Sequence, residues 1–502
     1  MKFILQMDPS MAAIGKIDSD DFIKWLFWCQ DNTDSNVDIV LWETDCFMEQ
    51  ETPANNRTNY YNFKKQNIDI MQRIIDECHS RGIKAYFHHR FSEVEREAFY
   101  PENDENGNII PEGRNRVKYE HPDWVIKTWW KNGLWNLASK GMQDFKLEYL
   151  TNMMKKYNFD GICIDYLRHL PCLPVGKQWE YRHCATEFMC RLKEAMRGLG
   201  RDIMVGAKLP ENLKACHEDG FDIEEWSKKK CVDFVIAGSR TINPDISGYK
   251  EIMGDREVYA CWDTWHVADA YHFQSADFYR GMFSNWRLQC ADGIVGFNYA
   301  PAPQNELKKL LPEDDIYRTS GDEWSEIYTH IKDSENSGLS TRYAADRRGG
   351  YPYLTGCGGN NVFAQLPAAI PNDGTPFDVR INVCAEYEGR DVGLKAVITN
   401  AKADCDKFRL IINGKEIENF RTNFYYQDGY IFWPDPQPIT LRNACMKSKC
   451  ANILAIEADF GSELLKVGEN IVSISVIDRR NYILDSDSIN IEKIELTVKE
   501  KR

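Results

Sequence analysis

The chain has 502 residues and a formal net charge of −15, because 77 acidic residues outnumber 62 basic ones. This length is enough to bury one large hydrophobic core and a second, smaller one. The acidic balance argues against a nucleic-acid partner, since phosphates are neutralised by Lys and Arg, and equally against an anionic membrane surface. We interpret the charge as an aid to solubility.

The sequence contains no run of 18 apolar residues, so we expect no membrane-spanning helix. The N-terminal segment MKFILQMDPS lacks a long apolar region and a small-residue cleavage site, which favours a first strand over a signal peptide. The 16 cysteines form no CxxC pair and indicate free thiols in a reducing compartment. We therefore expect a cytoplasmic protein, or an exported one whose leader is absent from this chain.

The N-terminal two-thirds alternates apolar runs of strand length with segments of helical period. The runs are Phe3–Met7, Val37–Trp42, Ile83–Phe87, Gly161–Ile164, Ile203–Ala207, Val232–Ala237, Val258–Trp262 and Gly293–Phe297. Such near-continuous apolar strands indicate a parallel sheet buried on both faces, and eight of them favour a (β/α)8 barrel over residues 1–345. A doubly wound open sheet is the alternative, but no glycine fingerprint follows the first strand.

After about residue 346 the helical period disappears, and short alternating strands take its place. They include Phe377–Val383, Val392–Ile398, Phe408–Ile412, Ile471–Val476 and Ile489–Val498. The dipeptide Asn413-Gly414 between two of these strands is a strong hairpin signal. We predict an antiparallel β-sandwich as an accessory domain over residues 350–502, with the boundary near residue 350.

Asp165 is the strongest catalytic candidate, because it ends the predicted strand Gly161–Ile164. In a (β/α)8 barrel, catalytic side chains lie at the carboxyl ends of the strands. Arg168 follows three residues later, and a nearby cation keeps a carboxylate ionised, which suits a nucleophile or a base. The alternative is a structural ion pair between Asp165 and Arg168 at the rim of the barrel. Asp160 and Asp233 precede strands, so we assign them structural roles at the opposite end.

Several motifs resemble those of the (β/α)8 glycosyl hydrolases related to the family-10-like group. The matching segments are Asn136-Leu137-Ala138, the stretch Phe159–Arg168, His121-Pro122-Asp123-Trp124, Gly220–Trp226, and Ala291–Ile294 leading to Phe297-Asn298. The resemblance covers roughly residues 35 to 300. It implies a barrel that hydrolyses carbohydrate, and it does not identify the sugar. We expect no cofactor.

Glycoside hydrolysis generally needs two carboxylates, so a second acid must face Asp165. Asp263 ends the seventh predicted strand between Trp262 and Trp265, and these apolar neighbours favour the raised pKa of a proton donor. Glu211, after the fifth strand, is the competing candidate for the acid.

The residues expected to bind substrate also lie at or after strand ends. They are Glu43, His88, Arg90, Arg168, Trp262, Trp265 and Asn298. Adjacent strand residues point in opposite directions, so only one of His88 and His89 is expected to face the barrel interior. No HxH or HExxH spacing is present, and we predict no metal site. A non-catalytic carbohydrate-binding barrel and a metal-dependent hydrolase or lyase are the alternative functions.

Overall fold

A computed structural model describes most of the chain. The described residues are 1–7, 18–33, 36–43, 63, 66–92, 102–103, 109–110, 113–128, 133–238, 241–263, 276–297, 338–347, 363–402, 405–425, 429–430, 447–448, 453–479 and 488–501.

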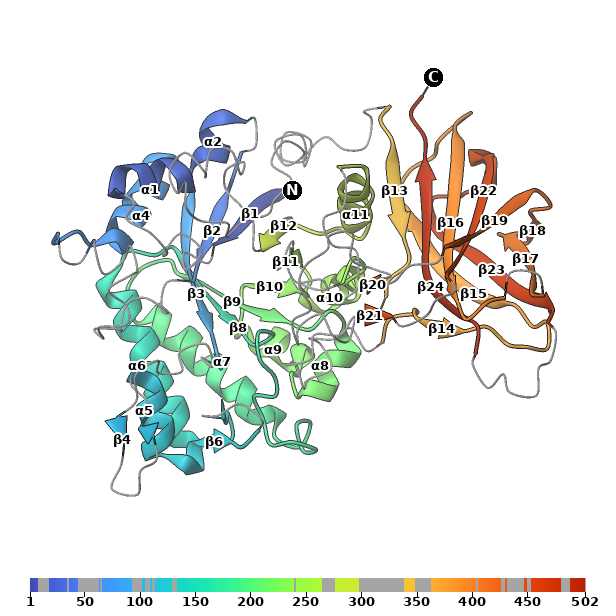
Figure 1. The fold of residues 1–502 in the computed structure, drawn as a ribbon. Helices are drawn as coiled ribbons and strands as arrows, with labels where there is room; N and C mark the ends of the chain where they lie inside the picture. The colour runs from blue at the N-terminus through green and yellow to red at the C-terminus, as the bar shows by residue number, and fades with distance from the viewer. Residues whose placement is uncertain are drawn as a thin grey trace.

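Eight parallel strands form a closed barrel, shown at the left of Figure 1. In chain order they are β1 (Lys2–Met7), β2 (Ile39–Trp42), β3 (Lys84–Arg90), β8 (Gly161–Asp165), β9 (Met204–Leu209), β10 (Phe234–Ala237), β11 (Glu257–Asp263) and β12 (Gly293–Phe297). Each strand pairs with the next, and β12 pairs with β1 to close the ring. The predicted (β/α)8 barrel is confirmed.

Helices connect the barrel strands. They are α1 (Ser19–Leu26), α2 (Trp28–Asn32), α4 (Ile70–Ser80), α5 (Gly113–Glu120), α6 (Lys140–Lys156), α7 (Arg182–Arg197), α8 (Leu213–Asp219), α9 (Ile223–Lys229), α10 (Ile246–Met253) and α11 (Ala276–Leu288). Many begin at a side chain that accepts a hydrogen bond from the first turn, as Ser139 does for α6 and Asp222 for α9. The connection between β3 and α6 also holds β4 (Glu102–Asn103), β5 (Ile109–Ile110), β6 (Val125–Ile126) and β7 (Leu134–Trp135).

Side chains of the barrel strands alternate between two apolar cores. The inward-facing ones, such as Tyr86, Cys163 and Tyr259, form a small cluster inside the ring. Their outward-facing neighbours join the large core between the strands and the helices. Gly206 makes room inside the ring, because a Cβ there would lie 2.3 Å from the ring of Phe234. The barrel is therefore filled, and a site can form only at its ends.

The acids at strand starts tie neighbouring strands together. Asp160 accepts hydrogen bonds from the backbone N–H of Ala85 and from His79, both at 2.9 Å. Asp233 accepts one from the backbone N–H of Val205 at 2.7 Å and pairs with a lysine of α7. Both residues thus have the predicted structural role at the amino-terminal end of the strands.

The C-terminal part forms a β-sandwich, as predicted, seen at the right of Figure 1. One sheet has the order β13-β24-β16-β22-β19, with β14 added to β24, and the other has the order β15-β23-β17-β18. The strands are β13 (Thr341–Ala344), β14 (Ala368–Ala369), β15 (Phe377–Val383), β16 (Asp391–Thr399), β17 (Lys407–Ile412), β18 (Lys415–Glu416), β19 (Phe420–Tyr425), β22 (Ile453–Gly461), β23 (Gly468–Asp478) and β24 (Asn490–Val498). A separate ribbon pairs β20 (Gly429–Tyr430) with β21 (Lys447–Ser448).

The hairpin predicted at Asn413-Gly414 joins β17 to β18, and both residues have positive φ, as its turn requires. The first sandwich strand, β13, lies at the end of the range predicted for the barrel, yet it pairs with β24. The boundary near residue 350 stays a prediction, because residues 298–337 and 348–362 lie outside the described residues.

The sandwich packs on the barrel through α11, which lies beside β13 in Figure 1. Gly281 permits the close approach, because a Cβ there would lie 1.9 Å from the carbonyl oxygen of Arg342. The Arg342 guanidinium pairs with Asp277 at 3.1 Å, and the amide of Asn285 donates to the carbonyl of Asn382 at 2.8 Å. The helix after the seventh barrel strand is thus fixed to the second domain.

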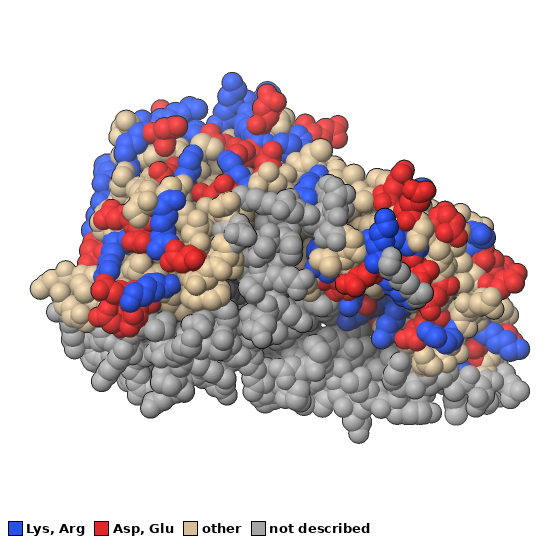
Figure 2. All heavy atoms as spheres, turned by 90° about the horizontal axis from the view of Figure 1, so that it is seen from above, with Lys and Arg blue, Asp and Glu red and all other residues tan. Residues whose placement is uncertain are grey.

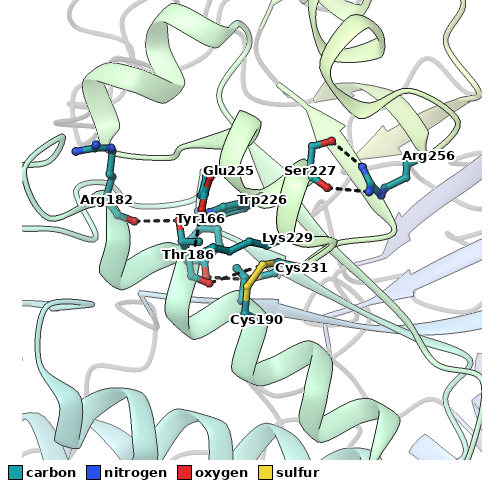
Figure 3. The surroundings of a disulfide bond; sticks show 11 residues. Tyr166, Arg182, Thr186, Cys190, Glu225, Trp226, Ser227, Lys229, Cys231 and Arg256 are labelled. Atoms are coloured by element: carbon teal, nitrogen blue, oxygen red, sulfur yellow. Dashed lines mark hydrogen bonds and ion pairs between the residues drawn. A yellow bond between two sulfur atoms is a disulfide. The ribbon is translucent and has the colours of Figure 1, made fainter.

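A disulfide joins Cys190 of α7 to Cys231, just before β10 (Figure 3). The expectation that the cysteines are free thiols is wrong for this pair, although ten other described cysteines are free. Figure 3 shows Thr186 and Trp226 beside the bond, and the Trp226 indole donates to the Thr186 hydroxyl at 3.0 Å. The disulfide therefore lies in the shell between α7 and α9. A periodicity argument could not find it, because the two cysteines are 41 residues apart.

The described surface carries both signs of charge. Figure 2 shows Lys and Arg interspersed with Asp and Glu over the face seen from above. Within the described residues, no helix has the length and apolar character needed to cross a membrane.

Candidate active site

Five buried polar side chains meet at the carboxyl ends of neighbouring barrel strands. Gln6 comes from β1, Glu43 follows β2, His88 lies on β3, Asp165 ends β8, and Lys208 lies on β9. Each is at most 2% exposed. Polar groups are buried at this depth only when they satisfy one another or a ligand, so this layer is the candidate active site.

The two carboxylate oxygens of Asp165 have different partners. Oδ1 accepts hydrogen bonds from the backbone N–H groups of Leu167 and Arg168, at 2.9 and 3.1 Å. Oδ2 faces the His88 ring, with Nε2 at 3.7 Å. The two amides fix the carboxylate plane, and Oδ2 is the oxygen directed toward the other side chains of the site.

The charges around Asp165 keep it ionised. Burial raises the pKa of this carboxyl, but the positive charges of Lys208, His88, Arg90 and Arg168, in that order, outweigh burial and lower the pKa below 3.8. Arg168 lowers the pKa of Asp165, in the predicted direction, although Lys208 lowers it more. The Arg168 residue also holds Asp165 through its backbone N–H.

Lys208 is oriented by Gln6. Its ammonium donates to Gln6 Oε1 at 2.7 Å and lies 4.0 Å from the centre of the Phe297 ring. The Gln6 amide nitrogen donates to Glu43 Oε1. Lys208 pairs in register with Asp165 on the neighbouring strand, so the cation and the carboxylate are held by backbone geometry as well.

Glu43 is the second buried carboxylate of the layer. Its Oε2 pairs with the guanidinium of Arg90, and its Oε1 lies 3.2 Å from His88 Nδ1. Because Oε1 also accepts from Gln6, this one carboxylate contacts three members of the site. Glu43, His88 and Arg90, all predicted to bind substrate, are thus brought together with Asp165.

The two candidates for the proton donor come from β9 and β11, which lie on either side of β10 in the ring. Glu211 follows β9 and is 1% exposed, in contact with the segment after β10, where a Cβ on Gly238 would lie 3.1 Å from Glu211 Cγ. Asp263 is the last residue of β11, and its side chain lies outside the described residues. Trp265 and Asn298 also lie outside them.

Trp262 differs from its predicted position. It is 3% exposed and packs against Phe278 of α11, with ring centres 6.3 Å apart. Sugar stacking requires an exposed ring face, which Trp262 does not offer. The reason is strand alternation, because Tyr259 and Cys261 of the same strand occupy the barrel interior and direct Trp262 outward.

A metal ion does not fit this site well. Among the described residues, Glu43, His88 and Asp165 offer ligand atoms that all lie within 4.8 Å of one another. However, the Arg90 guanidinium already pairs with Glu43, and Lys208 lowers the pKa of Asp165. A divalent cation would add charge beside two buried cations, so we retain the prediction of a metal-free site.

Sequence reasoning missed Gln6 and assigned no role to Lys208. Both follow the inward parity of their strands, Gln6 two residues after Ile4 and Lys208 two residues after Gly206. A polar residue at an inward position near the end of an apolar strand indicates a site residue. This residue is overlooked when the apolar run is considered only as a whole.

No protein-family model matches the chain, and no curated protein matches it. Among solved structures, a cycloisomaltooligosaccharide glucanotransferase from Paenibacillus sp. is 11% identical with a TM-score of 0.34, over 98% of this chain and 57% of its own. A beta-galactosidase from Marinomonas ef1 is 12% identical with a TM-score of 0.40, over 66% and 59%. A maltogenic alpha-amylase from Thermotoga neapolitana is 8% identical with a TM-score of 0.39, over 94% and 98%.

The chain thus spans less than two thirds of the length of the first two proteins. Likenesses this distant carry no argument about activity, so function has to be argued from the site. The resemblance to the family-10-like group is not confirmed by a family match.

Proposed function

We propose that this chain is a glycoside hydrolase whose reacting carboxylate is Asp165. The observation that carries the proposal is the setting of this side chain, which is buried at the carboxyl end of a barrel strand among cations that lower its pKa. A nucleophile or base in glycoside hydrolysis must be a carboxylate rather than a carboxylic acid. The four cations around Asp165 supply that condition.

The second carboxyl group donates a proton to the leaving oxygen. We propose Asp263 for this role and keep Glu211 as the alternative, since Asp263 ends β11 and Glu211 follows β9, at the same end of the barrel as Asp165. The stereochemical outcome depends on the distance between the two carboxyls, about 5–5.5 Å in retaining enzymes and about 6.5–9.5 Å in inverting ones.

The first experiment compares Asp165→Asn with Asp160→Asn. Each change removes one negative charge from the same segment, but Asp160 lies at the opposite end of the strand, where it ties β8 to β3. On a panel of 4-nitrophenyl glycosides and oligosaccharides, we expect Asp165→Asn to lower kcat by about 10²–10⁴-fold. Asp160→Asn should leave kcat close to that of the unmodified chain. Activity of Asp165→Asn within about tenfold of wild type would contradict the assignment.

The second experiment assigns the acid. Asp263→Ala should impair substrates with poor leaving groups far more than aryl glycosides with good ones, because a good leaving group needs little protonation. If Asp263→Ala loses activity equally on both kinds of substrate, and Glu211→Gln loses more on substrates with poor leaving groups, the role moves to Glu211. Binding of oligosaccharides without turnover by the unmodified chain would instead support a non-catalytic carbohydrate-binding barrel.

A further inference from the structure

The two adjacent histidines of β3 have opposite surroundings. Both His88 and His89 are fully buried, at 0% exposure. Strand alternation directs His88 into the barrel mouth and His89 toward α6, as expected for neighbours on a strand. Because the two rings are equally buried, they differ only in the groups that each ring contacts.

His88 stands between two carboxylates. Nδ1 lies 3.2 Å from Glu43 Oε1, and Nε2 lies 3.7 Å from Asp165 Oδ2. A carboxylate accepts hydrogen bonds and cannot donate them, whereas a neutral imidazole has one N–H and one lone pair. Either neutral tautomer therefore places a lone pair against a carboxylate oxygen. Only the doubly protonated ring offers an N–H to both.

His89 faces an ammonium group instead. Its Nε2 lies 3.0 Å from Lys146 Nζ, and Lys146 is itself fully buried, with the aromatic rings of Phe91 and Trp135 within about 5.5 Å. An ammonium has donors and no acceptor, so the His89 nitrogen must carry the lone pair. With Lys146 as the donor, the ring proton would lie on Nδ1 and the ring would be neutral.

We propose that His88 is a positioning residue that carries a proton on both ring nitrogens and holds Asp165 and Glu43 on either side, whereas His89 one position later is neutral. The neighbouring cations do not replace it, since Arg90 pairs with the other oxygen of Glu43 and Lys208 donates to Gln6. The imidazolium places its positive charge 3.7 Å from Asp165 Oδ2, the oxygen that does not accept from the backbone N–H groups. The inference deepens the proposed function, but it concerns the resting protein and needs no substrate.

The test is a long-range ¹H–¹⁵N correlation spectrum of the full chain labelled with ¹⁵N-histidine, recorded at neutral pH. This spectrum distinguishes a doubly protonated ring from each neutral tautomer. The ten histidines of the chain are few enough to assign His88 and His89 by the loss of one signal set in His88→Gln and in His89→Gln. We expect two protonated nitrogens for His88 and one, Nδ1, for His89.

Two further measurements separate positioning from a general structural role. In Asp165→Asn, the new amide can donate to His88, so we expect the ring to lose its Nε2 proton. In turnover, His88→Gln should lower kcat by about 10–100-fold with a smaller change in KM, since it removes the positive charge that faces both carboxylates. His89→Gln is the matched control, because its amide oxygen still accepts from Lys146, and kcat should be unchanged.

A singly protonated His88 in the unmodified chain would overturn the proposal, as would a ring state that does not respond to Asp165→Asn. Stoichiometric loss of the His88 N–H signals on addition of Zn²⁺ would also overturn it and would identify the site as a metal centre. Because these spectra need no substrate, they can be interpreted even if the chain shows no glycosidase activity. The activity assays can likewise be interpreted if the ring states differ from those expected.

Discussion

The interaction between Asp165 and Lys208 can be measured by a double-mutant cycle with Asp165→Asn, Lys208→Met and the double variant. The two side chains are 2% and 1% exposed, pair in register on β8 and β9, and Lys208 is the strongest of the cations that lower the pKa of Asp165. Removing either of these two opposite buried charges leaves the other less compensated, at a cost below the about 3–5 kcal/mol of breaking a buried ion pair. Each single variant should therefore be moderately destabilised.

The double variant should recover part of this loss, because no lone charge remains. We expect a coupling free energy of about 1–3 kcal/mol, from urea unfolding of the full chain with unchanged m-values. The exposed pair of Lys140 and Glu187, at 3.1 Å, is the control, and its cycle should give less than about 1 kcal/mol. If the effects of the two single variants add up to the effect of the double variant within about 0.5 kcal/mol, the reasoning is refuted.

Four other predictions concern acid stability, domain packing, the disulfide and metals. Since the pKa of Asp165 is lowered on folding, its stabilisation is present above the ordinary value of 3.8 and is lost as pH falls through the lowered pKa. Melting temperatures of Asp165→Asn should accordingly fall less steeply than those of wild type at acid pH. Gly281→Val should cost at least about 1–3 kcal/mol by overpacking against the β13 backbone, whereas Gly393→Ala, 3.6 Å from its nearest neighbour, should cost less in the same unfolding assay. Cys190→Ser should lower stability by about 2–4 kcal/mol, and a matching loss on reduction of the wild type would tie the effect to the bond with Cys231. Incubation with EDTA should leave glycosidase activity unchanged, and a reversible loss restored by a divalent cation would contradict the metal-free site.

Much of the fold could be predicted because the strands are long apolar runs. The predicted strand Gly293–Phe297 matches β12 in full, and all eight runs became barrel strands. The end of a strand is harder to predict where polar residues extend it beyond its apolar run. The apolar run of the third strand ends at Phe87, but β3 continues to Arg90, since its last side chains are stabilised by Glu43 and Lys146 rather than by an apolar environment.

The site could be predicted only in part. The sequence predicts the place of Asp165 in the buried polar layer, because an acid at a strand end of a barrel points to chemistry. Trp262 is not at the barrel mouth because strand parity directs it outward, whereas a tryptophan beside an acid suggests sugar binding. Lys208 received no role, because a lysine after an apolar run suggests the end of a strand rather than a buried counter-charge. The parity of inward positions along each strand would have improved both assignments.

The contact made by α11 has a consequence for how this chain can be divided. Phe278 and Met282 of this helix, with Tyr343 of β13, line the junction between barrel and sandwich. A barrel cut off after β12 would expose this apolar helix face to water and invite aggregation. The two domains should therefore be expressed together, and moving the sandwich onto another barrel would require moving α11 as well.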